Sequence, residues 1–420
     1  MTPLKKILRL ILPSALMGLL AGVYHFILAY LGAVVYGFPS RRLLVIAVTG
    51  TKGKTSVSEM ITAILEEAGY STALINSIRF KIAGASERNV SRMSMPGRFF
   101  IQRFLRNARR AGCTAAVIEM TSEGARQNRH RAIALDALVF TNLAPEHIES
   151  HGSYQLYADA KFKIGEALAR SPKRPRILVA NAEDTQSARY LALPLEKARA
   201  FSLEECAHSA NETGGQFTFN GVNISIKLPG DFSLKNALAA STLARELGID
   251  TPTIRRALEK IERIPGRAER IDAGQDFTVV VDYAHTPDSL IALYEAYGNM
   301  LKICVLGNTG GGRDTWKRAE MGAIADTHCA EVILTNEDPY DENPRAIVDA
   351  MAQGCTRQPS IIMDRREAIR YALARAKKGD VVLISGKGTD PSICVAHGKK
   401  IPWSDADVAR EELKRLERQV

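Results

Sequence analysis

VIAVTGTKGKTS, residues 45–56, predicts a β-strand followed by a tight turn and the start of a helix. The β-branched run is typical of a buried strand, and the glycines allow backbone N–H groups to surround a phosphate. Lys54 adds a positive charge, and Thr55 offers a hydroxyl that can bind magnesium. We therefore expect a nucleotide-phosphate loop made of Gly50, Thr51, Lys52, Gly53, Lys54, Thr55 and Ser56. Val48 stands where the common form of this loop has its first glycine, so an ordinary strand-to-helix turn is the alternative.

Short apolar runs alternate with helical stretches along the rest of the chain. The runs lie at residues 43–48, 115–120, 137–142, 176–181, 278–283, 302–307, 331–336 and 381–386. Continuous apolar strands between amphipathic helices indicate parallel sheets covered on both faces, so the predicted fold class is α/β. Ligands of such sheets bind beyond the carboxyl ends of the strands, where most of these runs end in polar or glycine residues. The site is therefore expected to draw on many loops.

The chain of 420 residues is long enough for two or three domains. We predict a hydrophobic segment at residues 1–40, a central nucleotide-binding domain at 41–264 and a second α/β domain at 265–420. The second boundary follows from the sequence IPGR at residues 264–267, which lies between a helical stretch and a new series of strands. Residues 201–230 alternate between polar and apolar side chains, which predicts a small antiparallel sheet.

The composition argues against a nucleic-acid-binding protein. The formal net charge is +10, but the basic residues are scattered and form no platform with aromatic residues. Anionic small substrates or anionic lipid explain the charge as well. The six cysteines contain no CxxC pair and lie far apart, so we expect neither a zinc site nor a disulfide framework, and a reducing cytoplasm fits.

Residues 10–40 contain no Asp, Glu, Lys or Arg and are mostly apolar, which predicts a membrane segment. A cleaved signal peptide and a buried helix are the alternatives, but the run is longer than a signal core of roughly 7–15 residues. Basic residues lie on both sides of the run, at Lys5, Lys6, Arg9, Arg41 and Arg42. The orientation therefore stays open between a single span and a segment that dips into the bilayer and returns. We expect the protein at the cell membrane, with the domains that follow this segment on the cytoplasmic side.

Acidic, histidine and lysine side chains follow two of the predicted strands. Glu119 ends one run, where a carboxylate can hold a magnesium ion together with Thr55; a solvated acid is the alternative. Residues 141–168 contain Glu146, His147, Glu149, His151 and Lys161. A histidine among carboxylates can serve a metal, whereas a polar loop with helix-capping acids and a surface lysine is the alternative.

Several ordered segments resemble the sequence motifs of the Mur ligase family. They are TGTKGKT (49–55), the segment ending at Glu119, TNLAPEHIESHGSYQLYADAK (141–161), PGDFSLKNALAA (229–240), PGRAER (265–270), DYAHTPDSL (282–290), GNTGGGRDTWKRAEMG (307–322) and SGKGTD (385–390). The resemblance covers residues 45–410 and is greatest to the muramyl-tripeptide synthetase branch, which adds the third residue of the peptidoglycan stem peptide. It implies a central ATP-binding domain with a phosphate loop, followed by a Rossmann-like domain with contacts to the amino acid and to ATP.

The resemblance implies an ATP-dependent, ADP-forming acid–amino-acid ligase that works through an acyl phosphate on a muramyl-peptide acceptor. The implied catalytic residues are Lys54, Glu119, His147 and Lys161. Two magnesium ions are implied on Thr55, Glu119, His147 and Lys161, the last of which is carbamylated in the family. ATP is expected to contact the phosphate loop with Asn236, His285 and Arg313, and the substrates are expected to contact Arg318, Glu337, Asp338, Tyr340, Lys387 and Asp390.

This chain departs from the family pattern at several positions. Lys52, Glu123 and Ser233 stand where Asn, His and Asn are usual. Tyr340 replaces the arginine that grips the distal carboxylate of diaminopimelate in relatives that add it, and Glu337 suits an ammonium group better than a carboxylate. The added amino acid therefore stays open between diaminopimelate, lysine and others.

The front of the chain also departs from the family, which usually carries an N-terminal domain for the uridine nucleotide of the acceptor. Only about forty residues precede the phosphate loop, so we expect that domain to be missing and the acceptor to be either nucleotide-linked or lipid-linked. Two other functions remain as alternatives. One is a polyglutamate-type or other peptide-extending ligase, and the other is a membrane-tethered scaffold that binds ATP without chemistry. The oligomeric state is open.

Overall fold

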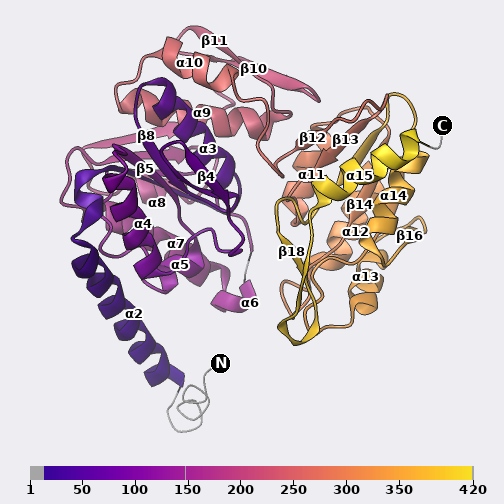
Figure 1. The fold of residues 1–420 in the computed structure, drawn as a ribbon, viewed down its shortest axis with the longest axis horizontal. Helices are drawn as coiled ribbons and strands as arrows, with labels where there is room; N and C mark the ends of the chain where they lie inside the picture. The colour runs from indigo at the N-terminus through magenta and orange to yellow at the C-terminus, as the bar shows by residue number, and fades with distance from the viewer. Residues whose placement is uncertain (1–13, 147, 419–420) are drawn as a thin grey trace. The chain divides into compact units, whose positions relative to one another are not determined.

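The computed structural model describes residues 14–146 and 148–418 (Figure 1). These residues fall into two compact units, which we describe separately. The first contains the chain up to residue 143 together with 155–201 and 242–249, and the second contains 144–154, 202–241 and the chain from residue 250 onward. The predicted domain boundaries at residues 41 and 265 stay predictions.

An eight-stranded sheet forms the centre of the first unit, in the order β4-β3-β2-β5-β1-β6-β7-β8. Its strands are β1 (Leu44–Thr49), β2 (Thr72–Ile75), β3 (Arg79–Ile82), β4 (Ala85–Arg88), β5 (Ala115–Glu119), β6 (Ala137–Phe140), β7 (Ile177–Asn181) and β8 (Lys197–Phe201). The six strands in the spatial order β2-β5-β1-β6-β7-β8 pair in parallel. The strands β3 and β4 extend the sheet beyond β2 with antiparallel pairing. Because β1 and β5 are buried on both faces, their sequences are almost wholly apolar.

Helices surround this sheet in Figure 1. They are α2 (Ser14–Tyr36), the short 3₁₀ helix η1 (Pro39–Arg42), α3 (Lys54–Glu67), α4 (Arg98–Arg110), α5 (Ser122–Arg126), α7 (Tyr154–Ala169) and α8 (Ser187–Leu191). The apolar side chains of α4 recur every three or four residues, so Ile101 and Leu105 are buried while Arg103, Arg109 and Arg110 are exposed. One side of α2 packs against α4.

The second unit contains a three-stranded antiparallel sheet of β9 (His208–Asn211), β10 (Gly214–Phe219) and β11 (Val222–Ile226). It also contains α6 (Ile148–His151), α10 (Thr251–Glu259) and the larger part of α9 (Asp231–Glu246), whose residues from 242 onward belong to the first unit. The helix α10 packs against β11. Asp250 caps α10 by accepting a 2.8 Å hydrogen bond from the backbone N–H of Thr253.

A six-stranded sheet, in the order β12-β13-β17-β14-β15-β16, makes up the larger part of the second unit. Its strands are β12 (Glu269–Ile271), β13 (Thr278–Val281), β14 (Lys302–Leu306), β15 (Glu331–Leu334), β16 (Ser360–Ile361) and β17 (Val381–Ile384); only β12 is antiparallel to its neighbour. On one face lie α11 (Pro287–Glu295), α12 (Lys317–His328) and α13 (Pro344–Ala352), and on the other α14 (Arg365–Arg375) and α15 (Asp405–Glu417). A small hairpin of β18 (Ser392–Cys394) and β19 (Lys400–Pro402), joined by the 3₁₀ helix η2 (Ala396–Gly398), follows β17.

The predicted α/β class is confirmed, because each of the eight apolar runs contains a strand of one of the two mostly parallel sheets. The antiparallel sheet predicted within residues 201–230 is also confirmed. The membrane segment predicted at residues 10–40 is not supported. Among the described residues, no helix is both long and apolar enough to cross a bilayer, and residues 10–13 lie outside the described part of the chain.

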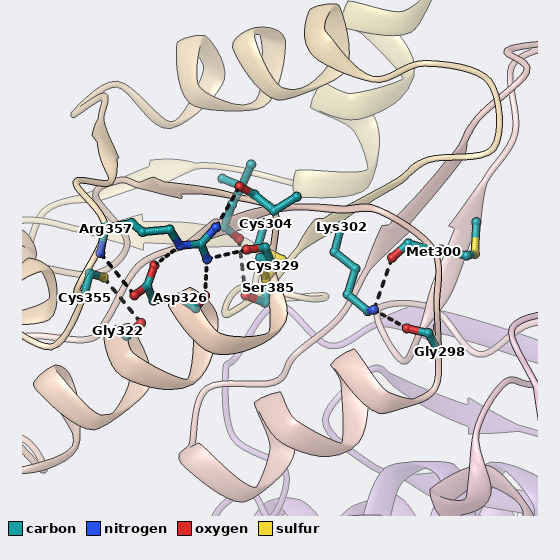
Figure 2. Close-up of a disulfide and its surroundings, with 12 residues drawn as sticks. Gly298, Met300, Lys302, Cys304, Gly322, Asp326, Cys329, Cys355, Arg357 and Ser385 are labelled. Atoms are coloured by element: carbon teal, nitrogen blue, oxygen red, sulfur yellow. Dashed lines mark hydrogen bonds and ion pairs between the residues drawn. A yellow bond between two sulfur atoms is a disulfide. The ribbon is translucent and has the colours of Figure 1, made fainter.

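A disulfide joins Cys304 of β14 to Cys329, the residue directly after α12 (Figure 2). The expectation that the cysteines form no disulfide is therefore wrong for this pair. The two residues are separated by 25 positions in the sequence, but α12 returns the chain to the sheet and leaves their Cα atoms 6.1 Å apart. Arg357 lies beside the bridge and donates a 2.7 Å hydrogen bond to the carbonyl of Cys329.

Candidate active site

The loop between β1 and α3 has the geometry of a phosphate cradle. Gly50 has a φ of 147°, and a Cβ atom there would lie 1.9 Å from Oγ1 of Thr141. Gly53, at a φ of 79°, directly precedes the helix. The backbone N–H of Lys52 donates to Oδ1 of Asn142 at 2.9 Å, and Oγ1 of Thr141 donates to the carbonyl of Lys52 at 2.6 Å. Neighbouring strand ends therefore hold the loop open, with the N-terminus of α3 facing it.

Lys54 and Thr55 begin α3 beside this loop. The ammonium group of Lys54 donates to the carbonyl of Thr51 at 2.8 Å, so its charge lies over the loop. Oγ1 of Thr55 donates to Oε2 of Glu119 at 2.9 Å and lies 2.8 Å from Oγ of Ser77. The parallel register of β1 and β5 brings Glu119 to this place, where it is buried. A hydroxyl and a carboxylate in contact are hard oxygen donors, which fits a magnesium ion.

Lys161 reaches the same loop from α7. Its buried ammonium group donates to the carbonyl of Gly50 at 2.5 Å and lies 4.7 Å from the ring centre of Tyr157. The hydroxyl of Tyr157 is 2.9 Å from Oγ1 of Thr51. His147, which we predicted as a metal ligand, lies outside the described residues. In the part of the chain that the structure describes, no three His, Cys, Asp or Glu side chains are grouped as a metal site.

In the second unit, His285 follows β13 and precedes the capping residue of α11. Its Nδ1 lies 2.6 Å from the carbonyl of Tyr283, and its Nε2 lies 2.8 Å from Oε1 of Glu146. The ring is therefore held in one orientation by a carbonyl and a carboxylate. Asn236 lies on α9, half-buried.

Lys387 and Asp338 form a buried ion pair at the carboxyl ends of β15 and β17. The ammonium group donates to Oδ1 of Asp338 at 2.9 Å and to the carbonyl of Ser392 at 2.8 Å, and it lies 3.3 Å from Oδ2 of Asp390. Asp338 also accepts a 2.7 Å hydrogen bond from the backbone N–H of Cys394. These contacts tie three loops together, so both side chains have a structural role whatever they bind.

Glu337 is buried beside this pair. Its Oε1 accepts a 2.9 Å hydrogen bond from Thr309, and its Oε2 has no hydrogen-bond partner among the described residues. Burial raises the pKa of Glu337. A Cβ atom at Gly386 would lie 2.3 Å from Oε2, so glycine is required there. This oxygen can accept a hydrogen bond from a ligand.

The two arginines of this region already have neighbours. Arg318 forms a two-pronged ion pair with Glu342, at 2.6 Å and 3.0 Å, and this contact lowers the pKa of Glu342. The guanidinium of Arg313 lies 4.9 Å from the ring centre of Tyr340. Tyr340 has a φ of 52° and donates its N–H to the carbonyl of Cys394 at 3.0 Å.

Sequence reasoning missed Ser77, Thr141, Asn142, Tyr157 and Glu342. Thr141 and Asn142 follow an apolar run, and this position is the signal that could have identified them. Tyr157 lies within the motif at residues 141–161, four residues before Lys161, and this position could have identified it, whereas nothing in the sequence around Ser77 indicates that its side chain reaches the site.

Two family models match this chain. The Mur ligase middle domain matches residues 48–244, and the Mur ligase glutamate ligase domain matches residues 266–388. The chain belongs to the Mur ligase family. A UDP-N-acetylmuramyl-tripeptide synthetase of Roseiflexus sp. (strain RS-1) is 37% identical over 419 residues, which cover 93% of this chain and 82% of that protein. A UDP-N-acetylmuramoyl-L-alanyl-D-glutamate–2,6-diaminopimelate ligase of Syntrophomonas wolfei is 35% identical over 404 residues, covering 92% and 81%.

Solved structures of Mur ligases and their relatives share this fold. A UDP-N-acetylmuramoyl-L-alanyl-D-glutamate–2,6-diaminopimelate ligase is 27% identical with a TM-score of 0.61, covering 89% of this chain and 79% of that one. A folylpolyglutamate synthase of Mycobacterium tuberculosis is 18% identical with a TM-score of 0.68, covering 86% and 92%. The latter likeness concerns the fold alone. The resemblance deduced from the motifs is thus confirmed at the level of the family, and the chain is an ATP-dependent acid–amino-acid ligase.

Proposed function

We propose that this Mur ligase joins an amino acid to the carboxyl group of a muramyl peptide and uses ATP as its energy source. One observation carries the proposal: Lys54, Thr55, Glu119 and Lys161 gather around a phosphate loop, in a chain 37% identical to a muramyl-tripeptide synthetase. The product would be a precursor of peptidoglycan. The alternative of an ATP-binding scaffold without chemistry is disfavoured because these polar side chains are all in contact with the loop or with its helix.

In the first step, a carboxylate oxygen of the acceptor attacks the γ-phosphorus of ATP, and the bond to the bridging oxygen breaks with release of ADP. The N–H groups of the loop and Lys54 neutralise the charge on the phosphates. Thr55 and Glu119 would hold a magnesium ion, which supplies further charge neutralisation when bound. An acyl phosphate of the acceptor results.

In the second step, the amine nitrogen of the incoming amino acid attacks the carbonyl carbon of the acyl phosphate. The carbon–oxygen bond to phosphate breaks, inorganic phosphate leaves, and the nitrogen loses a proton to give the amide. Positive groups such as Lys54 stabilise the oxyanion of the tetrahedral intermediate, and the bound orientation of both substrates supplies much of the acceleration.

We include carbamylation of Lys161 in the proposal. The ammonium group first loses one proton, Nζ then attacks the carbon of CO₂, and the nitrogen loses a second proton. A cation is thereby converted into an anionic carbamate with carboxylate-like oxygens. The burial of this lysine and the 2.5 Å contact of its Nζ with the carbonyl of Gly50 support the proposal, because they place the modified group beside the phosphate loop, where its oxygens could hold a metal ion. With His147, this group would hold a second magnesium ion.

The second unit favours an amino acid with a cationic side chain, such as lysine, over diaminopimelate. Tyr340 provides no guanidinium for a distal carboxylate, and Arg318 is already paired with Glu342. Glu337 offers a buried carboxylate oxygen that suits an ammonium group. In this proposal Asp338, Lys387 and Asp390 shape the pocket, while Asn236, His285 and Arg313 contact ATP.

The location and the carrier of the acceptor are also part of the proposal. We place the protein at the cytoplasmic face of the membrane, held by its N-terminal apolar segment, where either a nucleotide-linked or a lipid-linked muramyl peptide is within reach. A polyglutamate-type or other peptide-extending ligase is the second candidate, and the fold shared with a folylpolyglutamate synthase is compatible with it without favouring it.

The test is a ligation with the full chain, ATP, magnesium, UDP-linked muramyl dipeptide and an equimolar pool of amino acids, read by mass spectrometry. A single adduct with the mass of lysine supports both the reaction and the specificity. A diaminopimelate adduct refutes the specificity alone. Extension of a folate or other non-muramyl acceptor in parallel reactions, with no muramyl product, favours the second candidate.

A further inference from the structure

The outward face of α2 is apolar, whereas the outward face of a helix on a globular protein is usually polar. Nine of the sixteen exposed large hydrophobic side chains of the described residues belong to this helix. They are Leu20, Val23, Tyr24, Phe26, Ile27, Tyr30, Leu31, Val34 and Val35. A contiguous exposed apolar surface of this kind marks a site of interaction with a protein or a membrane.

The opposite face of α2 contacts the first unit between Gly22 and Val35, whereas the N-terminal end of the helix extends away from that unit (Figure 1). Ala29 and Ala33 are buried against α4. Near one end, Nδ2 of Asn128 donates to the carbonyl of Gly22 at 3.2 Å, and near the other, Arg106 donates to the carbonyl of Val35 at 3.4 Å. These contacts hold the inner face of α2 against the protein, so the apolar face points to solvent.

The chemistry around this face favours a lipid bilayer over a second protein. Three of the exposed side chains are aromatic, as is typical of segments at a membrane interface. The helix α4, which lies along α2, exposes Arg103, Arg109 and Arg110, and Arg41 and Arg42 follow the end of α2. Arginines beside an apolar helix are attracted to the anionic lipids of a bilayer surface.

A small cavity of about 150 Å³ adjoins the end of α2. Its lining includes Tyr30 from α2 itself, together with Arg41, His130, Arg131 and Arg170. None of the described residues that line it is acidic. Arg170 forms an ion pair with Glu166 at 3.4 Å on the exposed surface.

His130 is fully buried, and neither of its ring nitrogens has a hydrogen-bond partner among the described residues. Nε of Arg131 is likewise buried without a partner. Burial, together with the charges of Arg131, Lys163 and Arg170, lowers the pKa of His130 to about 3, so its ring is neutral and offers one N–H donor at physiological pH. Buried donors without acceptors are costly, and an anion with several acceptor oxygens would satisfy them.

We propose that α2 lies in the plane of an anionic bilayer with its apolar face in the boundary between head groups and acyl chains, and that this cavity binds the phosphate group of a lipid. Tyr30 links the two features, because it belongs to the apolar face and also lines the cavity. The inference rests on the proposed membrane location, and it does not depend on which amide the enzyme forms.

The test is sedimentation of the full chain with vesicles of phosphatidylcholine alone or mixed with phosphatidylglycerol. We expect strong binding only to the mixed vesicles. The double variant Arg41→Gln/Arg170→Gln should weaken that binding about 25-fold, from about fivefold for each arginine near an anionic surface. The triple variant Val23→Ser/Ile27→Ser/Val34→Ser should abolish it, and both variants should keep the unfolding temperature of the wild type.

A matched control removes the same charge elsewhere. Arg255 and Arg345 are exposed arginines of the second unit, each in a helical ion pair like that of Arg170. The variant Arg255→Gln/Arg345→Gln should bind vesicles within twofold of the wild type. If it loses as much binding as the cavity variant, net charge explains the result and the cavity assignment is wrong.

Three further outcomes overturn the inference. If the variant Arg41→Gln/Arg170→Gln binds vesicles as well as the wild type, the protein still binds the membrane but the cavity does not bind the lipid phosphate. A concentration-dependent dimer without vesicle binding, lost in the triple variant, assigns the apolar face to a second copy of the chain. Tight binding of inorganic phosphate by the wild type, with no recruitment to vesicles, makes the cavity a site for free anions. Because the assay needs no ATP, failure of the ligase reaction is read separately.

Discussion

Replacing Gly50 by alanine should disrupt the phosphate loop. The change should cost far more stability than Gly69→Ala, because Gly69 also has a positive φ but has no neighbouring atom that an added Cβ would meet. At Gly50 the Cβ atom would lie 1.9 Å from Oγ1 of Thr141, at a backbone φ of 147° that side chains rarely adopt. Thr141 must then move, and its 2.6 Å hydrogen bond to the carbonyl of Lys52 is lost. Since that bond holds the loop, the change should reach the nucleotide site.

The magnitude follows from two contributions. Backbone strain at such a φ costs about 1–3 kcal/mol, and a lost hydrogen bond costs about 1 kcal/mol. We therefore expect the free energy of unfolding to fall by about 3 kcal/mol. The control Gly69→Ala has a φ of 87° with no atom within 4 Å of the added carbon, so it reports the strain alone and should cost about 1 kcal/mol.

Urea unfolding of both variants measures the stability, and fluorescence titration with a labelled ATP analogue measures the affinity. Gly50→Ala should weaken nucleotide binding at least tenfold, whereas Gly69→Ala should leave it unchanged. The double variant Gly50→Ala/Thr141→Ala removes the clashing hydroxyl, so its destabilisation should be smaller than the sum of the two single changes by about 1–2 kcal/mol. Equal costs for Gly50→Ala and Gly69→Ala, with nucleotide affinity intact in both, would refute this account of the loop.

Four other changes test separate parts of the structure. Lys54→Ala should lower ATP-dependent phosphate release at least a hundredfold, because the positive charge that neutralises the transferred phosphate is lost. A rate within a few-fold of the wild type would contradict the assignment of this loop to phosphate binding. Tyr340→Arg should raise kcat/KM for diaminopimelate relative to lysine about tenfold or more, since it adds a fork for a distal carboxylate; an unchanged ratio would place specificity elsewhere. Reduction of the Cys304–Cys329 bond should lower the free energy of unfolding by about 3 kcal/mol from the 25-residue loop it closes, whereas the Cys304→Ala/Cys329→Ala variant should not respond to reductant. Hydrogen bonds from Thr356 and Arg357 lower the pKa of Asp326 to about 2, so the stabilisation by its ionised carboxylate is complete above about pH 4 and is lost as the pH falls towards 2. The difference in the free energy of unfolding between the wild type and Asp326→Asn should therefore shrink between pH 5 and pH 3. A difference that stays constant over this range would argue against an ionised contact.

The parallel strands could be predicted because each is buried on both faces and therefore reads as a continuous apolar run. The edge strands β3 and β4 could not, since ASER at residues 85–88 is wholly exposed and has no apolar signal. The phosphate loop was predictable for a similar reason, because its function requires glycine, lysine and a hydroxyl within a few residues. Thr141 supports that loop from 88 or more residues away in the chain, and only the pairing of β1 with β6 brings it there.

The disulfide and the membrane segment illustrate two other limits. Cys304 and Cys329 carry no spacing signal, because their proximity depends on the return path of α12. The apolar run at residues 10–40 is real in composition, but composition alone does not distinguish a helix that crosses a bilayer from one that packs along a protein surface. Among the described residues, α2 packs against α4, and no helix there is both long and apolar enough to cross a bilayer.

The charges around Glu337 give an independent argument for a cationic ligand in the second unit. Among the described residues, the buried Arg365 pairs with Asp405, and the buried Lys387 pairs with Asp338 and Asp390. Glu337 accepts a hydrogen bond from Thr309 but forms no ion pair with either cation in this part of the chain. The two cations lower the pKa of Glu337, but burial outweighs them and raises it overall. An ammonium group of a bound amino acid would supply the missing positive charge and would favour the ionised carboxylate. A carboxylate in its place would add a further anion beside Glu337, Asp338 and Asp390, so these charges support the proposal that the added amino acid has a cationic side chain.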